Sequence, residues 1–221
     1  MLQKLKYLFA LACCPLLLSA IEPDGEVVYK SIDDIELKLN VFNPEGHKAS
    51  DQRPAIVFFF GGGWNSGTPA QFYQQAEFIA DKGMVAFSAE YRVKSRNQTT
   101  PFECVKDAKS AVRWIRAHAE ELGVDPNRIV ASGGSAGGHI AGATGVIEGV
   151  EEDGEDLTVS SVPNLMILFN PVLDTTKKGY GAKNFKPEQQ TDLSLTHKVK
   201  PGIVPTPVSY THLTLPTTSR V

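Results

Sequence analysis

The spacing of apolar residues changes from alternating to continuous between residues 35 and 60. Every second residue over 35–41 is apolar, which predicts a half-buried strand that pairs antiparallel with a shorter strand over 27–30. Residues 55–60 contain only Ala, Ile, Val and Phe, as is typical of a central strand covered on both faces. Further apolar runs predict strands over 84–89, 128–132 and 165–169.

Apolar residues recur at helical spacing in three segments between these strands. The pattern predicts helices over 70–82, 101–122 and 136–147, and glycine follows the first two of them. Strands that alternate with helices favour right-handed crossovers and a parallel sheet. The sequence therefore predicts an α/β fold, a mostly parallel sheet flanked by helices, with an antiparallel pair at its N-terminal edge. The acidic stretch over 148–156 is expected to be a solvated loop.

The segment Gly133-Gly134-Ser135-Ala136-Gly137 fits the G-x-S-x-G pattern and lies between a predicted strand and a predicted helix. Glycines on both flanks let the chain make a tight turn with a serine hydroxyl at its tip. In a chain with 19 glycines among 221 residues, the pattern arises somewhere by chance in about one case in ten. Ser135 is therefore a candidate nucleophile that needs support from its surroundings.

A second glycine motif, Gly61-Gly62-Gly63, follows directly on the predicted central strand. An oxyanion hole needs backbone N–H groups that no side chain obstructs, and successive glycines supply them. A glycine-rich turn without a ligand is the alternative. Because a strand, a serine turn and a helix follow downstream, the combination favours a catalytic site.

Five segments together carry a family resemblance: 60–64, 90–92 (Glu-Tyr-Arg), 107–114, 125–128 and 133–138. In these the chain resembles the α/β-hydrolase superfamily, specifically the bacterial esterase and lipase branch related to hormone-sensitive lipase and carbohydrate acetyl esterases. The resemblance covers about 27–206. It implies the α/β-hydrolase fold, incomplete at the C-terminus.

The resemblance also implies roles for individual residues. Ser135 would be the nucleophile, and the backbone N–H groups of Gly62, Gly63 and Ala136 would form the oxyanion hole. Phe60 departs from the pattern, because the lipase branch usually has a histidine there. That histidine is not the catalytic base, so its replacement is expected to change the packing of the loop. Trp64 would either line the substrate site or pack in the core.

The acid and the base of a catalytic triad are harder to place. In this family the order is serine, then an acid after a later strand, then histidine near the C-terminus. Asp174 is the downstream carboxylate in a plausible position for the acid, although a loop or substrate-site role is preferred for it. His139 is expected to pack behind the serine turn, and His197 comes too early for the family's base.

The end of the chain explains why no acid and base of a catalytic triad are found at the family's positions. Residues 208–217 match the translation of a transposon-end adapter used in sequencing libraries, so 207–221, including His212, is interpreted as a non-native tail. The native acid and base are then expected beyond about Thr206. The predicted organisation is a signal peptide over 1–20, a partial α/β-hydrolase domain over 21–206, and this tail.

The start of the chain resembles a targeting segment. Two lysines precede an apolar run over 7–18, and small residues follow, which predicts export to the periplasm or the outside with cleavage near Ile21. The run is shorter than a membrane-spanning helix, so we expect no stable span after cleavage. A lipoprotein modified at Cys13 is the alternative. After cleavage near Ile21, Cys104 is the only cysteine of the mature chain, and it is expected to pack inside a helix.

Charge and composition argue against nucleic acid as a binding partner and against a bound cofactor. The formal charge of -3, from 22 basic and 25 acidic residues, includes no basic stripe for a nucleic-acid backbone. No pair of His or Cys has the spacing of metal ligands, so neither a metal nor an organic cofactor is implied. Asp107 and Arg113 are expected to anchor a helix to a loop, together with Arg92, by ionic hydrogen bonds.

These observations predict an exported serine carboxylester hydrolase. The expected substrates are short acyl esters, small molecules or polysaccharides such as acetylated carbohydrates, hydrolysed through an acyl-enzyme at Ser135. A lipase or an exopeptidase of the same fold is the enzymatic alternative. A catalytically inactive fragment is the alternative from a different class, because the chain as it stands lacks an identified base.

Overall fold

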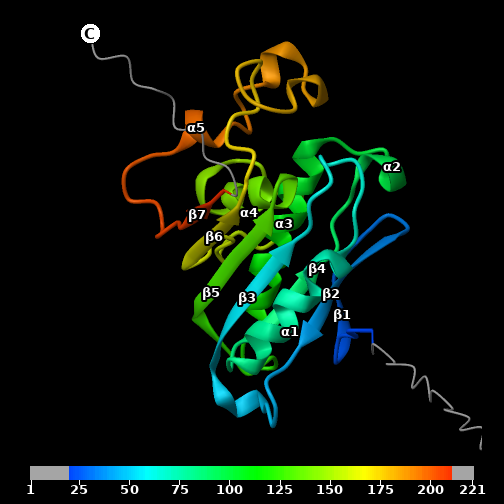
Figure 1. The fold of residues 1–221 in the computed structure, drawn as a ribbon, viewed down its shortest axis with the longest axis vertical. Coiled ribbons are helices and arrows are strands. Elements are labelled where there is room, and N and C mark those ends of the chain that lie inside the picture. The colour runs from blue at the N-terminus through cyan, green and yellow to red at the C-terminus, as the bar shows by residue number, and fades with distance from the viewer. Residues whose placement is uncertain (1–19, 211–221) are drawn as a thin grey trace, which may run out of the picture.

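Residues 20–210, the part of the chain that the computed structural model describes, are built around a seven-stranded sheet (Figure 1). Its order is β1-β2-β4-β3-β5-β6-β7. The strands β1 and β2 form an antiparallel hairpin, β2 also pairs antiparallel with β4, and the remaining neighbours are parallel. The strands are β1 (Gly25–Ile32), β2 (Ile35–Phe42), β3 (Arg53–Phe59), β4 (Val85–Ala89), β5 (Val124–Gly134), β6 (Leu165–Phe169) and β7 (Val208–Ser209).

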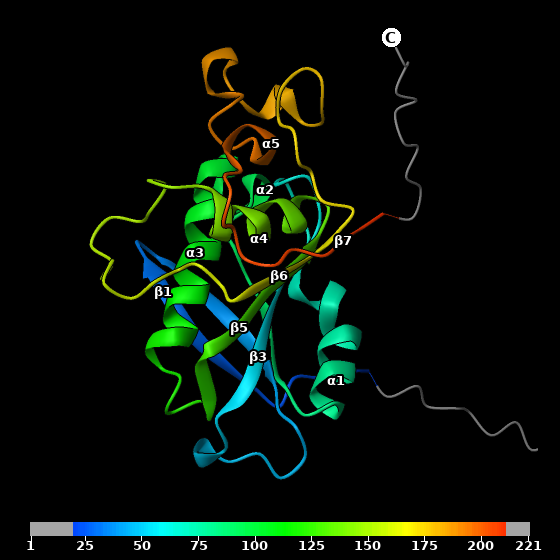
Figure 2. The same cartoon turned by 90° about the vertical axis from the view of Figure 1, so that its left-hand side faces the viewer.

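Helices cover both faces of this sheet, with α1 on one side and α3 on the other (Figure 2). They are α1 (Tyr73–Asp81), α2 (Lys94–Asn97), α3 (Pro101–Ala117), α4 (Ala136–Val146) and α5 (Leu195–Lys198), with short 3-10 turns at Ala49–Asp51, Pro69–Phe72, Ala182–Asn184 and Pro187–Gln189. Within residues 20–210, none of these helices combines the length and the apolar character that crossing a bilayer requires. The arrangement is the predicted α/β fold.

The central strand β3 shows why the continuous apolar run has no alternation. Residues 55–60 are all buried, because β4 and β5 flank the strand and helices lie over both faces. The carboxyl ends of the parallel strands β3, β4, β5 and β6 meet at one edge of the sheet. In open α/β sheets this edge is where ligands bind, and both glycine motifs lie on it.

Strands β1 and β5 are longer than the predicted 27–30 and 128–132, and two helices also differ from the prediction at their ends. The helix expected over 101–122 ends at Ala117, because His118 leaves the helical backbone geometry and its Nδ1 contacts the Trp114 carbonyl at 2.9 Å. The helix expected over 70–82 starts as the 3-10 turn Pro69–Phe72 before α1 begins. The spacing of apolar residues predicts which face of a helix is buried. It does not predict where the backbone hydrogen-bond pattern changes, so neither helix end could be predicted from it.

Part of the predicted tail lies in the sheet. Val208–Ser209 pairs parallel with β6, and the backbone N–H groups of Met166, Leu168 and Asn170 donate to the carbonyls of Pro205, Pro207 and Ser209. This pairing needs only extended backbone, so the origin of 207–221 stays a prediction. The predicted signal peptide, except for residue 20, and His212 lie outside the described residues.

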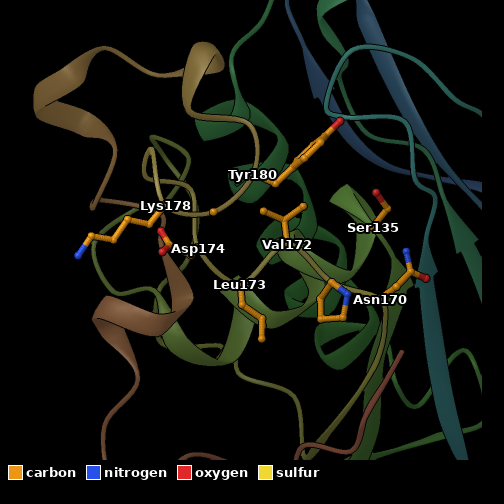
Figure 3. A pocket seen from close by; sticks show the side chains of 9 residues that line it. Ser135, Asn170, Val172, Leu173, Asp174, Lys178 and Tyr180 are labelled. Carbon is orange, nitrogen blue, oxygen red and sulfur yellow. The ribbon is translucent and has the colours of Figure 1, made fainter. Parts of the chain in front are cut away.

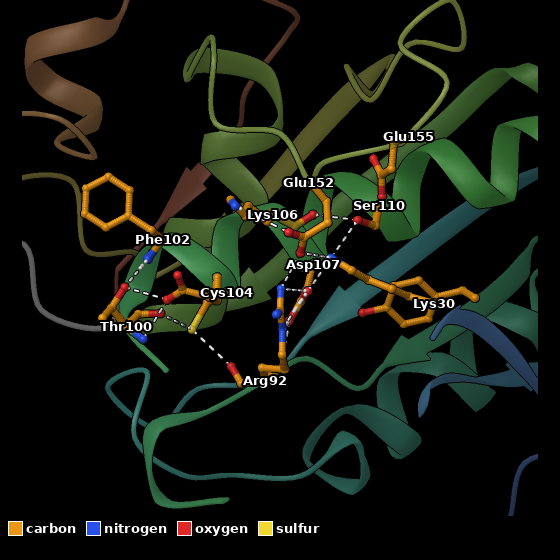
Figure 4. Close-up of polar contacts among 12 residues, drawn as sticks. Lys30, Arg92, Thr100, Phe102, Cys104, Lys106, Asp107, Ser110, Glu152 and Glu155 are labelled. Atoms are coloured by element: carbon orange, nitrogen blue, oxygen red, sulfur yellow. Dashed lines mark hydrogen bonds and ion pairs between the residues drawn. The ribbon is translucent and has the colours of Figure 1, made fainter. Parts of the chain in front are cut away.

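The acidic stretch over 148–156 is a loop, but the expectation that it is solvated is wrong for three of its carboxylates. Glu151, Glu152 and Glu155 are half-buried and pair with buried or half-buried cations on the body of the protein: Lys30, Arg92, Lys106, Lys109 and Arg113. Buried cations are costly without counterions, and this loop supplies them (Figure 4). Although burial opposes ionisation of Glu152, its bonds to Lys30 and Arg92 lower its pKa to about 2.

Asp107 anchors α3 as the sequence predicts. Its carboxylate is fully buried and accepts from the Arg92 backbone N–H at 2.9 Å, the Arg92 guanidinium at 2.8 Å and Lys30 Nζ at 2.7 Å. Arg113 joins the same helix to the acidic loop. Cys104, also buried, donates its thiol to the Arg92 carbonyl at 3.1 Å, and burial raises the pKa of this thiol. All three residues have the structural roles that were predicted.

Candidate active site

Ser135 lies at the tip of a tight turn between β5 and α4, with φ 55° and ψ -119°. Its flanking glycines are needed for steric reasons. A Cβ on Gly137 would lie 2.0 Å from the Phe59 carbonyl oxygen, and one on Gly133 would lie 2.6 Å from backbone atoms of Gly137. The turn therefore packs backbone on backbone against the end of β3. A serine in this left-handed conformation is unusual for a residue with a Cβ, and such outliers concentrate at functional sites.

The glycine loop lies directly against this turn. A Cβ on Gly61 would be 3.3 Å from the Ser135 Cβ. The backbone N–H groups of Gly62 and Gly63 donate to no protein acceptor in the described part of the chain. Ala136 is the first residue of α4, where a backbone N–H has no partner within the helix. The three predicted oxyanion donors thus lie on two segments that meet beside Ser135.

Ser135 lines an open pocket of about 410 Å³ together with residues that follow β6 (Figure 3). The lining residues are Ser135, Asn170, Pro171, Val172, Leu173, Asp174, Lys178, Gly179 and Tyr180. The Tyr180 side chain is exposed, and the Asn170 backbone has φ 37°. The position of Asn170, a polar residue directly after the strand predicted over 165–169, is the sequence signal that could have placed it at this edge. Lys178 and Tyr180 lie in an irregular segment and carry no such signal.

Asp174 lies in the same pocket, but its carboxylate bonds to Thr176 and Ser194 and to no histidine of the described residues. In Figure 3 Val172 lies between Asp174 and Ser135. The Asp174 carboxylate accepts from the Thr176 backbone N–H at 2.8 Å and from the Ser194 hydroxyl at 3.4 Å. The Thr176 backbone bond is the main cause of the lowered pKa of this carboxyl. The structure brings the predicted acid candidate to the pocket without linking it to a histidine that reaches Ser135.

His139 is a packing residue, as predicted from its position behind the turn. It is fully buried, its Nδ1 accepts from the Trp64 indole N–H at 3.3 Å, and its Nε2 lies 2.7 Å from the Leu193 carbonyl. Burial lowers the pKa of this imidazole to about 4. Since both ring nitrogens are engaged and the ring is neutral, His139 is not free to take a proton from Ser135.

This buried imidazole predicts a loss of stability in mild acid. The unfolded chain binds a proton at His139 below its ordinary pKa of 6.5, whereas the folded chain does so only near 4. The free energy of unfolding should therefore fall by up to about 3 kcal/mol between pH 6.5 and 4. Urea unfolding at a series of pH values measures this. His139→Asn should give a flatter profile, and a wild-type profile without slope in that window would contradict the assignment.

The other histidines in residues 20–210 also have partners other than Ser135. His197 Nδ1 is 2.7 Å from the Ser194 hydroxyl, and the rings of His47 and His118 contact backbone carbonyls. This placement agrees with the expectation that His197 comes too early in the chain to be the family's base. Within the described range, Ser135 therefore lies beside backbone N–H groups of the glycine loop that have no acceptor, and no histidine hydrogen-bonds to this serine.

Trp64 lies beneath the glycine loop rather than on the pocket wall. It is 1% exposed, and its indole packs edge-on against His139 and Phe185. Phe60, at the position of the family's histidine, stacks on Tyr91 with ring centroids 4.1 Å apart. Of the two alternatives for Trp64, core packing is the one that the structure favours. Its contact with Phe185 ties the loop to the segment that carries Tyr180.

Comparison with known proteins gives this geometry a family context. The BD-FAE family profile matches residues 39–198. Apo esterase 2 of Thermogutta terrifontis is 48% identical in sequence with a TM-score of 0.79, over 83% of this chain and 70% of that one. The probable carboxylic ester hydrolase LipM of Mycobacterium tuberculosis is 36% identical over 119 residues, which is 53% of this chain.

A plant relative matches over a similar part of the chain. The probable isoprenylcysteine alpha-carbonyl methylesterase ICMEL1 of Arabidopsis thaliana is 31% identical over 123 residues. The matches span only 25% of ICMEL1 and 27% of LipM. The chain thus corresponds to about a quarter of each of these curated relatives and to most of the solved esterase.

Proposed function

Since the chain belongs to the BD-FAE family and has the fold of an α/β-hydrolase esterase, we propose that it is a serine carboxylester hydrolase with Ser135 as the nucleophile. One observation carries the proposal. Ser135 lies on a tight turn at the carboxyl edge of the sheet, with the glycine loop against its Cβ. That placement matches what acyl transfer needs, an accessible hydroxyl beside backbone N–H groups without acceptors.

The chemistry follows from this placement. The Ser135 Oγ attacks the ester carbonyl carbon, its proton passes to a base, and the negative charge that develops on the carbonyl oxygen is stabilised by the N–H groups of Gly62, Gly63 and Ala136. Each such donor lowers the barrier by ~3 kcal/mol. The alcohol then leaves with a proton, and water releases the acid from the acyl-enzyme by the reverse sequence.

We infer that the substrates are short acyl esters. The pocket beside Ser135 holds about 410 Å³, which suits a small acyl or alcohol group. The esterase of Thermogutta terrifontis has been solved with propionate and with butyrate bound, which supports a short acyl chain here. Acetyl groups on carbohydrates are the finer proposal, and they rest on the resemblance described above.

The test is hydrolysis of p-nitrophenyl esters of increasing acyl length by the purified chain. We expect kcat/KM to be highest for the acetyl to butyryl esters and to fall for octanoyl and longer esters. Acetate release from acetylated xylan then separates carbohydrate esters from simple ones. A rate that rises with acyl length would favour a lipase, and activity on peptides alone would favour an exopeptidase.

A second candidate is an inactive fragment. It is favoured by one observation: His47, His118, His139 and His197 all contact groups other than Ser135. Background rates for every ester, with the chain folded by circular dichroism, would support this candidate. Sequencing the gene's uninterrupted reading frame past Thr206 is the complementary measurement. An acid and a histidine in that frame would support the hydrolase, and their absence would support the inactive fragment.

A further inference from the structure

The glycine loop is held one peptide group at a time. A trans peptide group is planar, so its C=O and the N–H of the next residue point in opposite directions. Fixing a carbonyl therefore fixes the direction of the following N–H. The loop has three consecutive groups of this kind, which join Phe60 to Gly61, Gly61 to Gly62, and Gly62 to Gly63.

The first of these groups is held at both ends. The Tyr91 hydroxyl is buried and donates to the Phe60 carbonyl at 2.7 Å. At the other end, the Gly61 N–H donates to the Gln71 side-chain oxygen at 3.0 Å. The peptide group before the oxyanion donors thus cannot turn without breaking two hydrogen bonds.

The second group depends on the same glutamine. The Gln71 Nε2 donates to the Gly61 carbonyl at 3.2 Å, and this carbonyl shares its plane with the Gly62 N–H. The third group is held by the loop itself, because the Gly62 carbonyl accepts from the backbone N–H groups of Asn65 and Ser66 at 3.1 and 3.2 Å. Within residues 20–210, Gln71 is accordingly the one side chain that hydrogen-bonds to the peptide group carrying the Gly62 N–H.

We propose that Gln71 is a positioning residue that aims the Gly62 N–H at the oxyanion. This proposal rests on the proposed function, since it assigns how the oxyanion donors of that site are oriented. Glycine rotates more freely about its backbone bonds than other residues, so three glycines in a row need external restraint to present two N–H groups in one direction. Gln71 is exposed and lies on the 3-10 turn before α1, where it adds little to the core.

The first test is a measurement of backbone order that needs no activity. We expect Gln71→Ala to lower the 15N order parameters of Gly61 and Gly62 from about 0.85 to below about 0.6, with the thermal midpoint nearly unchanged. Gln71→Glu keeps an acceptor for the Gly61 N–H and removes the donor, so it should loosen Gly62 more than Gly61. Gln75→Ala, an exposed glutamine on α1 whose side chain makes no hydrogen bond within the described residues, should change neither.

The second test uses ester hydrolysis. Gln71→Ala should lower kcat by ~10-fold to 100-fold, the scale of a small misplacement of catalytic groups, with KM changed less than about twofold. Unchanged order parameters in Gln71→Ala would overturn the proposal, as would an unchanged kcat in an active protein. If the wild-type chain shows no hydrolysis, the proposed activity fails, and the order parameters alone decide the role of Gln71.

Discussion

Replacing Ser135 by alanine is expected to reduce hydrolysis of p-nitrophenyl acetate to the background rate. Ser135 is held on a tight turn at the carboxyl edge of the sheet, with the glycine loop against its Cβ. Without the hydroxyl no acyl-enzyme forms, and loss of a catalytic serine lowers kcat by on the order of 10⁶-fold in a serine hydrolase. The measurement is the initial rate for the purified chain and for Ser135→Ala under the same conditions.

Ser132→Ala is the matched control for this experiment. Ser132 lies on β5, the strand that leads into the serine turn. It is buried and donates its hydroxyl to the Ile167 carbonyl at 2.7 Å. Removing this bond should cost about 1 kcal/mol of stability and leave the rate nearly unchanged. Equal rates above background for wild type and Ser135→Ala would show that another group is the nucleophile. Equal rates at background would favour the inactive fragment.

Replacing Asp107 by alanine is expected to destabilise the fold by about 3–5 kcal/mol, the cost of removing one partner from a buried ionic cluster. The Asp107 side chain is 0% exposed and pairs with Arg92 and Lys30. Its loss leaves both cations buried with the half-buried Glu152 as their shared counterion. Urea unfolding at neutral pH measures the change.

A control variant separates the loss of stability in Asp107→Ala from the effect of removing any surface charge. Asp153→Ala removes an exposed carboxylate of the acidic loop, and its effect should stay within about 0.5 kcal/mol. Asp107→Asn keeps the shape and one acceptor, so it should lose less than Asp107→Ala. A change below about 1 kcal/mol in Asp107→Ala would show that the network contributes little, and that Glu152 alone compensates the two cations.

The secondary structure followed from local patterns because burial on a sheet or helix repeats at fixed intervals. The continuous run over 55–60 has no alternation because neighbours cover both of its faces, and it is the central strand. The end of the long helix did not follow, since the His118 contact with the Trp114 carbonyl is a matter of geometry and not of hydrophobicity. Nor did the burial of Glu152, which depends on cations far away in the sequence.

Some features of the candidate site could likewise be predicted from the sequence, and others only from the tertiary structure. The sequence by itself determined the α/β order, the serine turn and the glycine loop, because glycine spacing reflects steric limits that hold wherever such a turn occurs. Only the tertiary structure decided that His139 is buried and engaged, that Trp64 packs beneath the loop, and that Gln71 and Tyr91 hold its peptide groups. Those contacts join residues distant along the chain, and no local pattern encodes a hydrogen bond between segments that meet only when the sheet has formed.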